Sequence, residues 1–191
     1  MSEEYKSSSV VDVSAKIDGL RQEAASWAES GPYQAVNGLW VVLVKAANLL
    51  PRVGEEHEQI ASLLRRFDRA EAQAVLSTEG VDALLDLDPP LETALAEAGE
   101  RLQAIQARHE LGRVRQRRSS DPKAALGSLF EIVQRIRDKR EHGFKTPKGP
   151  RDSTILSAAS LILRSMVQTS LAKIESKDLR TGPVAQLQRR P

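Results

Sequence analysis

The stretch PKAALGSLFEIVQRIRDKREHG, residues 122–143, decides the fold because its apolar side chains recur at steps of three and four. That spacing places them on one face of an α-helix. Asp121 before Pro122 is a typical helix start, and Gly143 is a typical helix stop. We therefore expect an amphipathic helix over this stretch. The residues on its inward face are Leu126, Leu129, Phe130, Val133 and Ile136.

The same apolar spacing continues on both sides of this helix. Glycine and proline interrupt it at Gly31-Pro32, Gly80 and Pro89-Pro90, which divides the chain into further helical segments. We expect helices over residues 11–30, 32–50, 55–76, 81–87, 91–115 and 152–175, of which 81–87 is only a short piece. The side chains expected to face the core include Trp27, Trp40, Ala74, Leu95, Leu102, Ile105 and either His109 or Leu111.

The composition favours a single all-α domain. The 191 residues are 40% hydrophobic and 4% aromatic, and they contain no alternating run of β-branched residues that would indicate a strand. We expect an up-and-down helical bundle of about five to six helices over residues 11–175, with flexible tails at residues 1–10 and 176–191. The last two long helices are expected to form an antiparallel hairpin joined by a basic loop.

Several classes of protein are excluded by what the sequence lacks. The chain has no cysteine, which excludes disulfides and thiolate metal sites. It has no glycine-rich phosphate loop, zinc-ligand spacing or Gly-x-Ser-x-Gly turn. The N-terminus does not resemble a signal peptide, and the most apolar stretch, residues 39–50, is too short to span a bilayer. We expect a cytoplasmic protein with no metal, cofactor or membrane association.

The charges are segregated along the chain although the formal net charge is only +2. Residues 1–100 hold 8 Lys/Arg and 18 Asp/Glu, whereas residues 101–151 hold 14 and 5, and residues 152–191 hold 6 and 3. One interpretation is an electropositive surface that binds the phosphates of a polyanion. The other is that acidic and basic helices pack side by side and neutralise each other.

The end of the helix at residues 122–143 combines an arginine, an acid and a histidine. Asp138 and His142 are four residues apart, so they lie on one helix face within reach of each other. Arg137 and His142 are five residues apart and lie about 140° apart around the axis of a straight helix. The two could converge if the last turn unwinds near Gly143, or if two copies of the chain bring their helix ends together.

This pattern resembles the R-x4–6-H signature of HEPN domains, in which a polar residue follows the arginine. Arg137, Asp138 and His142 match that signature. The resemblance covers roughly residues 119–174, and it includes the apolar helix, the loop with lysine and proline, and a long apolar helix after an acidic start. It implies an all-α fold, a homodimer with the motif at its interface, and metal-independent cleavage of RNA.

The resemblance also implies roles for individual residues. Arg137 would contact the scissile phosphate, His142 would act as general acid or base, and Asp138 would orient the histidine. An RNA-cutting toxin or defence protein of this kind is expected to have an antitoxin, such as a nucleotidyltransferase-type partner. The residues expected to bind the RNA backbone are Lys139, Arg140, Lys145, Lys148 and Arg151.

Each of these residues has a structural interpretation as well. A histidine near a helix C-terminus favours the helix dipole, and Arg137 with Asp138 can form a solvated charge pair. Lys139, Arg140 and Glu141 depart from the family pattern, in which many relatives have apolar residues before the histidine. The alternative functions are therefore a non-catalytic module that binds nucleotide, RNA or a partner protein, and a helical interaction protein with no nucleic-acid role. The other acidic and histidine residues, at positions 55–58 and 109, indicate ordinary helix surfaces.

Overall fold

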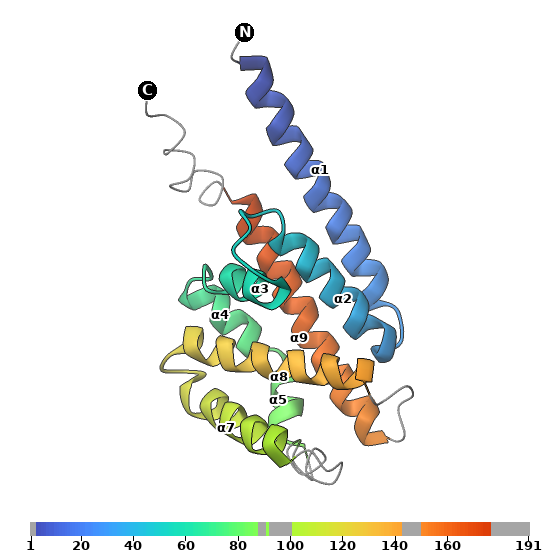
Figure 1. Ribbon diagram of the computed structural model, residues 1–191, viewed down its shortest axis with the longest axis vertical. Coiled ribbons are helices and arrows are strands. Elements are labelled where there is room, and N and C mark those ends of the chain that lie inside the picture. Colours follow the sequence, from blue (N-terminus) through green and yellow to red (C-terminus); the bar gives the residue numbers. More distant parts are fainter. Residues whose placement is uncertain (1–2, 88–90, 92–100, 143–149, 177–191) are drawn as a thin grey trace.

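The computed structural model describes residues 3–87, 91, 101–142 and 150–176, and within these the side chains of all residues except 3–12 and 139–151. The described part is entirely helical, which confirms the all-α fold class. Its helices are α1 Glu3–Ala28, α2 Pro32–Ala47, α3 Glu56–Leu64, α4 Arg69–Leu76, α5 Glu79–Leu85, α7 Arg101–Arg117, α8 Pro122–His142 and α9 Pro150–Glu175 (Figure 1).

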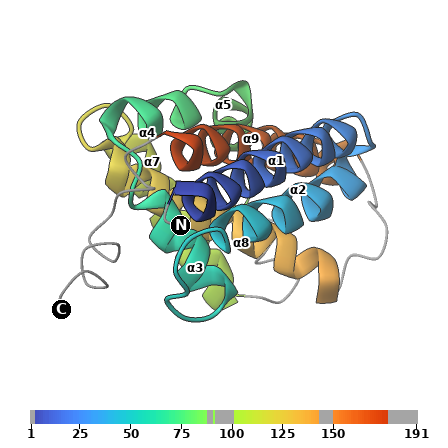
Figure 2. The ribbon, with the colours of Figure 1, turned by 90° about the horizontal axis from the view of Figure 1, so that it is seen from above.

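The helix α9 is the centre of the fold. It packs most extensively against α2 and α5 and also contacts α1 and α4, and Figures 1 and 2 both show it beside α1 and α2. Among its apolar positions, Ile162, Leu163 and Met166 are fully buried. By length and composition alone, Asp152–Glu175 is apolar enough to cross a membrane, and 56% of its apolar window is buried inside the protein. The core helix of a soluble protein passes the same test of length and composition.

The helix α8 runs across α9 instead of lying along it. It packs mainly against α7 and α4, and the two long helices cross in Figure 1. The expected antiparallel hairpin of the last two long helices is therefore wrong in its geometry. The residues that join them, 143–149, lie outside the described part of the chain.

The segment expected as one helix over residues 55–76 is two helices, α3 and α4. Asp68 begins α4 as its N-cap, because its carboxylate accepts a hydrogen bond from the Glu71 backbone N–H at 2.9 Å. The Glu71 side chain in turn accepts from the Asp68 backbone N–H at 2.7 Å, completing a capping box. The break resets the helical phase, so that Ala74 is exposed while Ala72 and Val75 are buried.

The helix α7 buries Leu111, one of the two expected alternatives, but not Leu102 or Ile105. Leu102 and Ile105 are exposed at 77% and 65%, and the His109 side chain is also exposed. The buried face is made by Ala104, Ala107, Leu111 and Val114. The small alanine side chains let α7 lie against α8, whereas leucine and isoleucine at those positions would hold the two helices further apart. Leu95 lies outside the described residues.

Two glycines permit close packing between helices. A Cβ on Gly38 would lie 2.0 Å from the Trp27 ring, so this glycine makes room for Trp27 of α1 against α2. A Cβ on Gly80 would lie 2.5 Å from the Ala158 carbonyl oxygen, so α5 can approach α9 only because residue 80 is glycine. Trp27 was expected to face the core, but it is 36% exposed and lies over Gly38 at the surface of the bundle.

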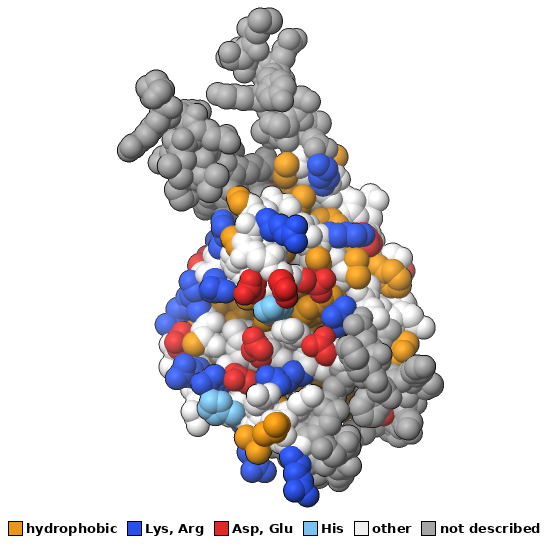
Figure 3. Space-filling model, viewed as in Figure 1, with side chains coloured by type: hydrophobic (Ala, Val, Ile, Leu, Met, Phe, Trp, Pro, Cys, Tyr) orange, Lys and Arg blue, Asp and Glu red, His pale blue; other side chains and the backbone are white. Residues whose placement is uncertain are grey.

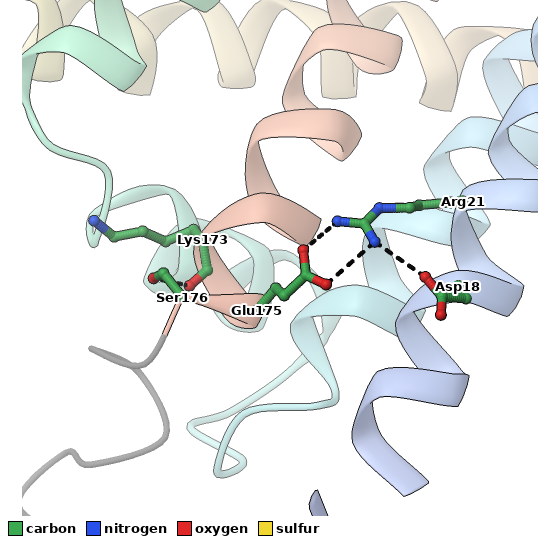
Figure 4. Close-up of polar contacts among 5 residues, drawn as sticks. All are labelled: Asp18, Arg21, Lys173, Glu175 and Ser176. Carbon is green, nitrogen blue, oxygen red and sulfur yellow. Dashed lines mark hydrogen bonds and ion pairs between the residues drawn. The ribbon is translucent and has the colours of Figure 1, made fainter. Parts of the chain in front are cut away.

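Ion pairs join the first helix to the rest of the bundle. Arg21 donates from Nη1 to Asp18 at 3.0 Å and from Nη2 to Glu175, which ties α1 to the end of α9 (Figure 4). The hydrogen bond to Glu175 is the main reason that the pKa of Arg21 is raised. Lys45 of α2 pairs with Glu23 of α1 at 2.8 Å. All five side chains are partly exposed, so these ion pairs contribute modestly to stability.

Candidate functional site

The end of α8 carries the arginine, acid and histidine of the expected site. Helix α8 is continuous from Pro122 to His142, so no unwinding before His142 brings Arg137 and His142 together. Their positions remain about 140° apart around the helix axis. The side chain of His142 and the residues from Gly143 to Gly149 lie outside the described part of the structure, so both routes by which the pair could converge stay predictions.

The guanidinium of Arg137 lies over the ring of Trp40. Its central carbon, Cζ, is 5.3 Å from the ring centroid, within the range of a cation–π interaction. Nη1 of Arg137 also lies 3.3 Å from Oδ1 of Asp138, and the Arg137 side chain is 23% exposed. Arg137 is thus half-buried, with one aromatic and one acidic neighbour, and part of it remains accessible to solvent.

Trp40 makes two further contacts, one with Phe130 and one with Glu56. Its ring stacks on Phe130, with the centroids 5.7 Å apart and the ring planes within 5° of parallel. Its indole Nε1 donates a hydrogen bond of 2.5 Å to Oε1 of Glu56, at the start of α3. Trp40 and Phe130 are both only 2% exposed. Their burial confirms the expectation that both residues pack in the core.

The spacing along α8 shows how Phe130 and Arg137 share one tryptophan. They are seven residues apart, which is two helical turns and about 10.5 Å of rise on the same face. Both side chains therefore reach the Trp40 ring from the same face of α8.

The remaining residues of the expected site are described only in part. Lys139, Arg140 and His142 belong to α8 and Arg151 belongs to α9, but their side chains lie outside the described part of the structure. Lys145 and Lys148 lie in the undescribed segment 143–149. The structure thus brings together Arg137 and Asp138 and places His142 one turn further along the same helix.

The arginines at the end of α7 are used to join helices. Arg115 donates to the Leu85 carbonyl oxygen at 2.5 Å, which satisfies the C-terminus of α5. Arg118, directly after α7, pairs with Asp82 of α5 at 2.6 Å. Arg113 pairs with Glu110 at 3.0 Å within α7 itself. Figure 3 shows acidic and basic side chains interspersed over one face of the molecule. At these positions the segregated charges of the sequence neutralise each other.

Two of the cavities among the described residues lie beside helices α1, α3, α7, α8 and α9. The larger, about 540 Å³, is an open groove between α3, α7 and α8, and it is lined by charged residues of both signs and by Phe130. The smaller, about 290 Å³, lies between α1 and α9 beside Arg21. Within the described residues, no three His, Asp or Glu side chains gather in a way that could hold a metal ion.

No local pattern in the sequence indicates that Trp40 and Glu56 lie beside Arg137. Trp40 is expected in the core from its spacing alone, and Glu56 looks like an ordinary acid in the first turn of a helix. A buried tryptophan needs a partner for its N–H, and an acid at the start of the following helix is a suitable acceptor. That requirement is the one signal that could have connected the two residues.

The fold and the α8 terminus define an all-α protein with an arginine positioned on a buried aromatic pair at a helix end. No family model matches the chain, no curated protein matches its sequence, and no solved structure matches its fold.

Proposed function

We propose that the protein is a metal-independent endoribonuclease of the HEPN type. The observation that carries the proposal is the placement of Arg137, which is partly exposed, one residue before Asp138 and in the final turns of α8. His142 follows on the same helix, four residues after Asp138. The all-α fold is compatible with the family, and the motif has the spacing of the family signature.

The chemistry of the proposed reaction needs a proton acceptor, a proton donor and a group that stabilises the phosphorane. The ribose 2′-oxygen attacks the phosphorus as its proton leaves to a base, and the 5′-oxygen departs with a proton from an acid. His142 takes one of these roles because imidazole titrates near neutrality. Arg137 offers a forked donor to the phosphate oxygens. The products are a 2′,3′-cyclic phosphate and a 5′-hydroxyl.

A homodimer is part of the proposal because Arg137 and His142 are five residues apart, which places them about 140° apart around a straight helix. A two-fold axis at the helix ends would place two arginines and two histidines in one cleft. Lys139, Arg140, Lys145, Lys148 and Arg151 would then surround that cleft and bind the RNA backbone. Such an enzyme would act in the cytoplasm as a toxin or defence ribonuclease, and an antitoxin such as a nucleotidyltransferase-type protein would restrain it.

The proposal is tested by incubating the purified protein with single-stranded RNA in excess EDTA. Wild type should cut the RNA, while His142→Ala and Arg137→Ala should lose cutting and keep their helical circular dichroism. His109→Ala is the matched control, because His109 is exposed on α7 and belongs to no motif. Analysis of the product ends should find the cyclic phosphate. A metal requirement, or full activity in both variants, would contradict the proposal.

A second candidate is a non-catalytic module of the same fold that binds nucleotide, RNA or a partner protein. The ion pair with Asp138 and the contact with Trp40 favour it, because they give Arg137 structural neighbours that do not require a substrate. The same assay separates the two candidates, since this module would bind RNA without forming products. Binding that weakens as salt is added would identify an RNA ligand.

A further inference from the structure

Three residues from two helices contact the Trp40 ring. Phe130 of α8 stacks on it, the guanidinium of Arg137 of α8 lies over it, and Glu56 of α3 accepts the indole N–H. These contacts restrain the ring, which is only 2% exposed. The guanidinium of Arg137 therefore rests on a well-packed surface.

We propose that Trp40, held in place by Glu56, is the positioning residue of Arg137. The inference rests on the proposed function, because it assigns Arg137 to the phosphate of the RNA. An arginine side chain has many rotamers, and a helix end exposed to solvent restrains few of them. The Trp40 face selects those in which the guanidinium stays beside α8, where the Arg137 side chain is 23% exposed.

Glu56 has a separate part in this arrangement. Its carboxylate accepts the hydrogen bond of the one polar atom of the indole, and this bond helps to fix the χ1 and χ2 torsions of Trp40. Loss of the bond leaves the buried N–H without its acceptor and lets these torsions shift, which displaces the ring beneath Arg137. Glu56 thus acts on Arg137 through Trp40, and neither residue is expected to touch the RNA.

The test compares RNA cleavage by Trp40→Phe and Glu56→Ala with cleavage by wild type, in EDTA and at a temperature where every variant is folded. Both variants should lose kcat by about 10- to 100-fold with KM nearly unchanged, because a small displacement of a catalytic group slows the chemical step. Glu56→Gln should recover most of the rate lost in Glu56→Ala, because the amide oxygen can still accept the indole N–H. A merely structural role would not produce this recovery.

Two matched controls are present in the chain. Trp27→Phe makes the same substitution at the other tryptophan, which is 36% exposed and packs over Gly38 of α2. Glu58→Ala removes a neighbouring acid of α3 whose carboxylate accepts from the Glu55 backbone N–H and not from Trp40. Both controls should cut RNA at the wild-type rate. Equal rates in Trp40→Phe, Glu56→Ala and wild type would overturn the positioning role and leave the ribonuclease proposal intact.

Fluorescence gives a readout that does not depend on cleavage. Trp27→Phe leaves Trp40 as the sole tryptophan, because the chain has two. A non-cleavable 2′-O-methyl oligonucleotide should change the Trp40 emission in this background, and Arg137→Met should abolish the change. If wild type fails to cut RNA but this change is seen, the ribonuclease proposal fails while Trp40 still positions an anion-binding arginine. If neither cutting nor the change is seen, both fail.

Discussion

The C-terminal ends of α7 and α8 are both rich in arginine, yet their guanidinium groups have different neighbours. At the end of α7, Arg115 donates to a backbone carbonyl of α5, and Arg118 pairs with Asp82, also on α5. At the end of α8, Arg137 lies against the buried ring of Trp40. The first end holds two helices together through polar contacts, and the second holds one cation on an apolar surface.

The difference shows that a cluster of arginines is not sufficient to identify a nucleic-acid surface. Arginines whose donors already bind carbonyl and carboxylate oxygens have fewer left for phosphate. A guanidinium stacked on an aromatic ring uses its face for that contact and keeps donors at its edge. The two ends therefore use their guanidinium groups differently: through carbonyl and carboxylate acceptors at α7, and through the Trp40 ring together with Asp138 at α8. The two helix ends should therefore differ in the stability that they contribute, in the coupling energy between their residues and in the salt dependence of that coupling.

The largest expected effect is on the aromatic support of the α8 end. Trp40→Ala should lower the free energy of unfolding by about 3–5 kcal/mol, because it removes a buried ring and leaves Phe130 and Arg137 around a cavity. Trp27→Ala should cost clearly less, because Trp27 is 36% exposed. Urea denaturation followed by circular dichroism measures both values. Equal losses would mean that Trp40 does not support the α8 end in the way described.

A smaller effect is expected from the cation itself. Arg137 and Trp40 should show a coupling energy of about 1 kcal/mol in a double-mutant cycle of Arg137→Met and Trp40→Phe, because a half-buried cation–π contact has this magnitude. The same cycle between Arg137→Met and Trp27→Phe should give no coupling. Chemical denaturation of the single and double variants measures both. A coupling energy of zero between Arg137 and Trp40 would mean that the ring does not stabilise the cation, and the two helix ends would no longer differ in this respect.

Much of the fold could be predicted from local sequence, and the departures have specific causes. The start of α8 at Pro122 was predicted because a cap, a proline and an apolar face agree. The split between α3 and α4 was missed although Asp68 and Glu71 have the spacing of a capping box. On α7, apolar periodicity indicated Leu102 and Ile105, but the face with small alanines is the one that packs.

The site was less predictable than the fold. Arg137, Asp138 and His142 were recognisable because they lie close together in the chain. The contact between Arg137 and Trp40 joins residues far apart in sequence, and no local pattern encodes it. Periodicity indicates which side chains are buried, but it does not indicate which buried ring will meet a particular cation. That pairing depends on how α2 crosses α8, which is set by the packing of the whole bundle.

The polar end of α7 should show the weaker and more salt-sensitive coupling. Arg118 and Asp82 are 27% and 53% exposed, so a cycle of Arg118→Gln and Asp82→Asn should give about 0.2–1 kcal/mol. About 1 M salt should reduce this value strongly, because exposed charges are screened over a few ångströms. The coupling of Arg137 with Trp40 should change less under the same conditions. If the Arg118–Asp82 coupling energy did not change with salt, this pair would behave as a buried ion pair, and the prediction would be wrong.

The smallest expected effect lies at the start of α4, the helix that packs against α8. The Glu71 backbone N–H is the main cause of the lowered pKa of Asp68, and the positive charges of Lys173 and Lys123 add to it. A carboxyl whose pKa is lower in the folded chain stabilises the fold above its unfolded pKa, and this stabilisation is lost as the pH falls through the folded pKa.

Asp68→Asn keeps an oxygen that can cap α4 but removes the charge, so it isolates this electrostatic part. Wild type should have the higher melting temperature near neutral pH, and the difference should shrink towards zero as the solution is made acidic. Thermal melts at several pH values measure it. A difference that stays constant with pH would assign the stabilisation to the hydrogen bond alone. In that case the charge of a side chain would stabilise the ends of α7 and α8. The start of α4 would be stabilised by the geometry of its capping hydrogen bond.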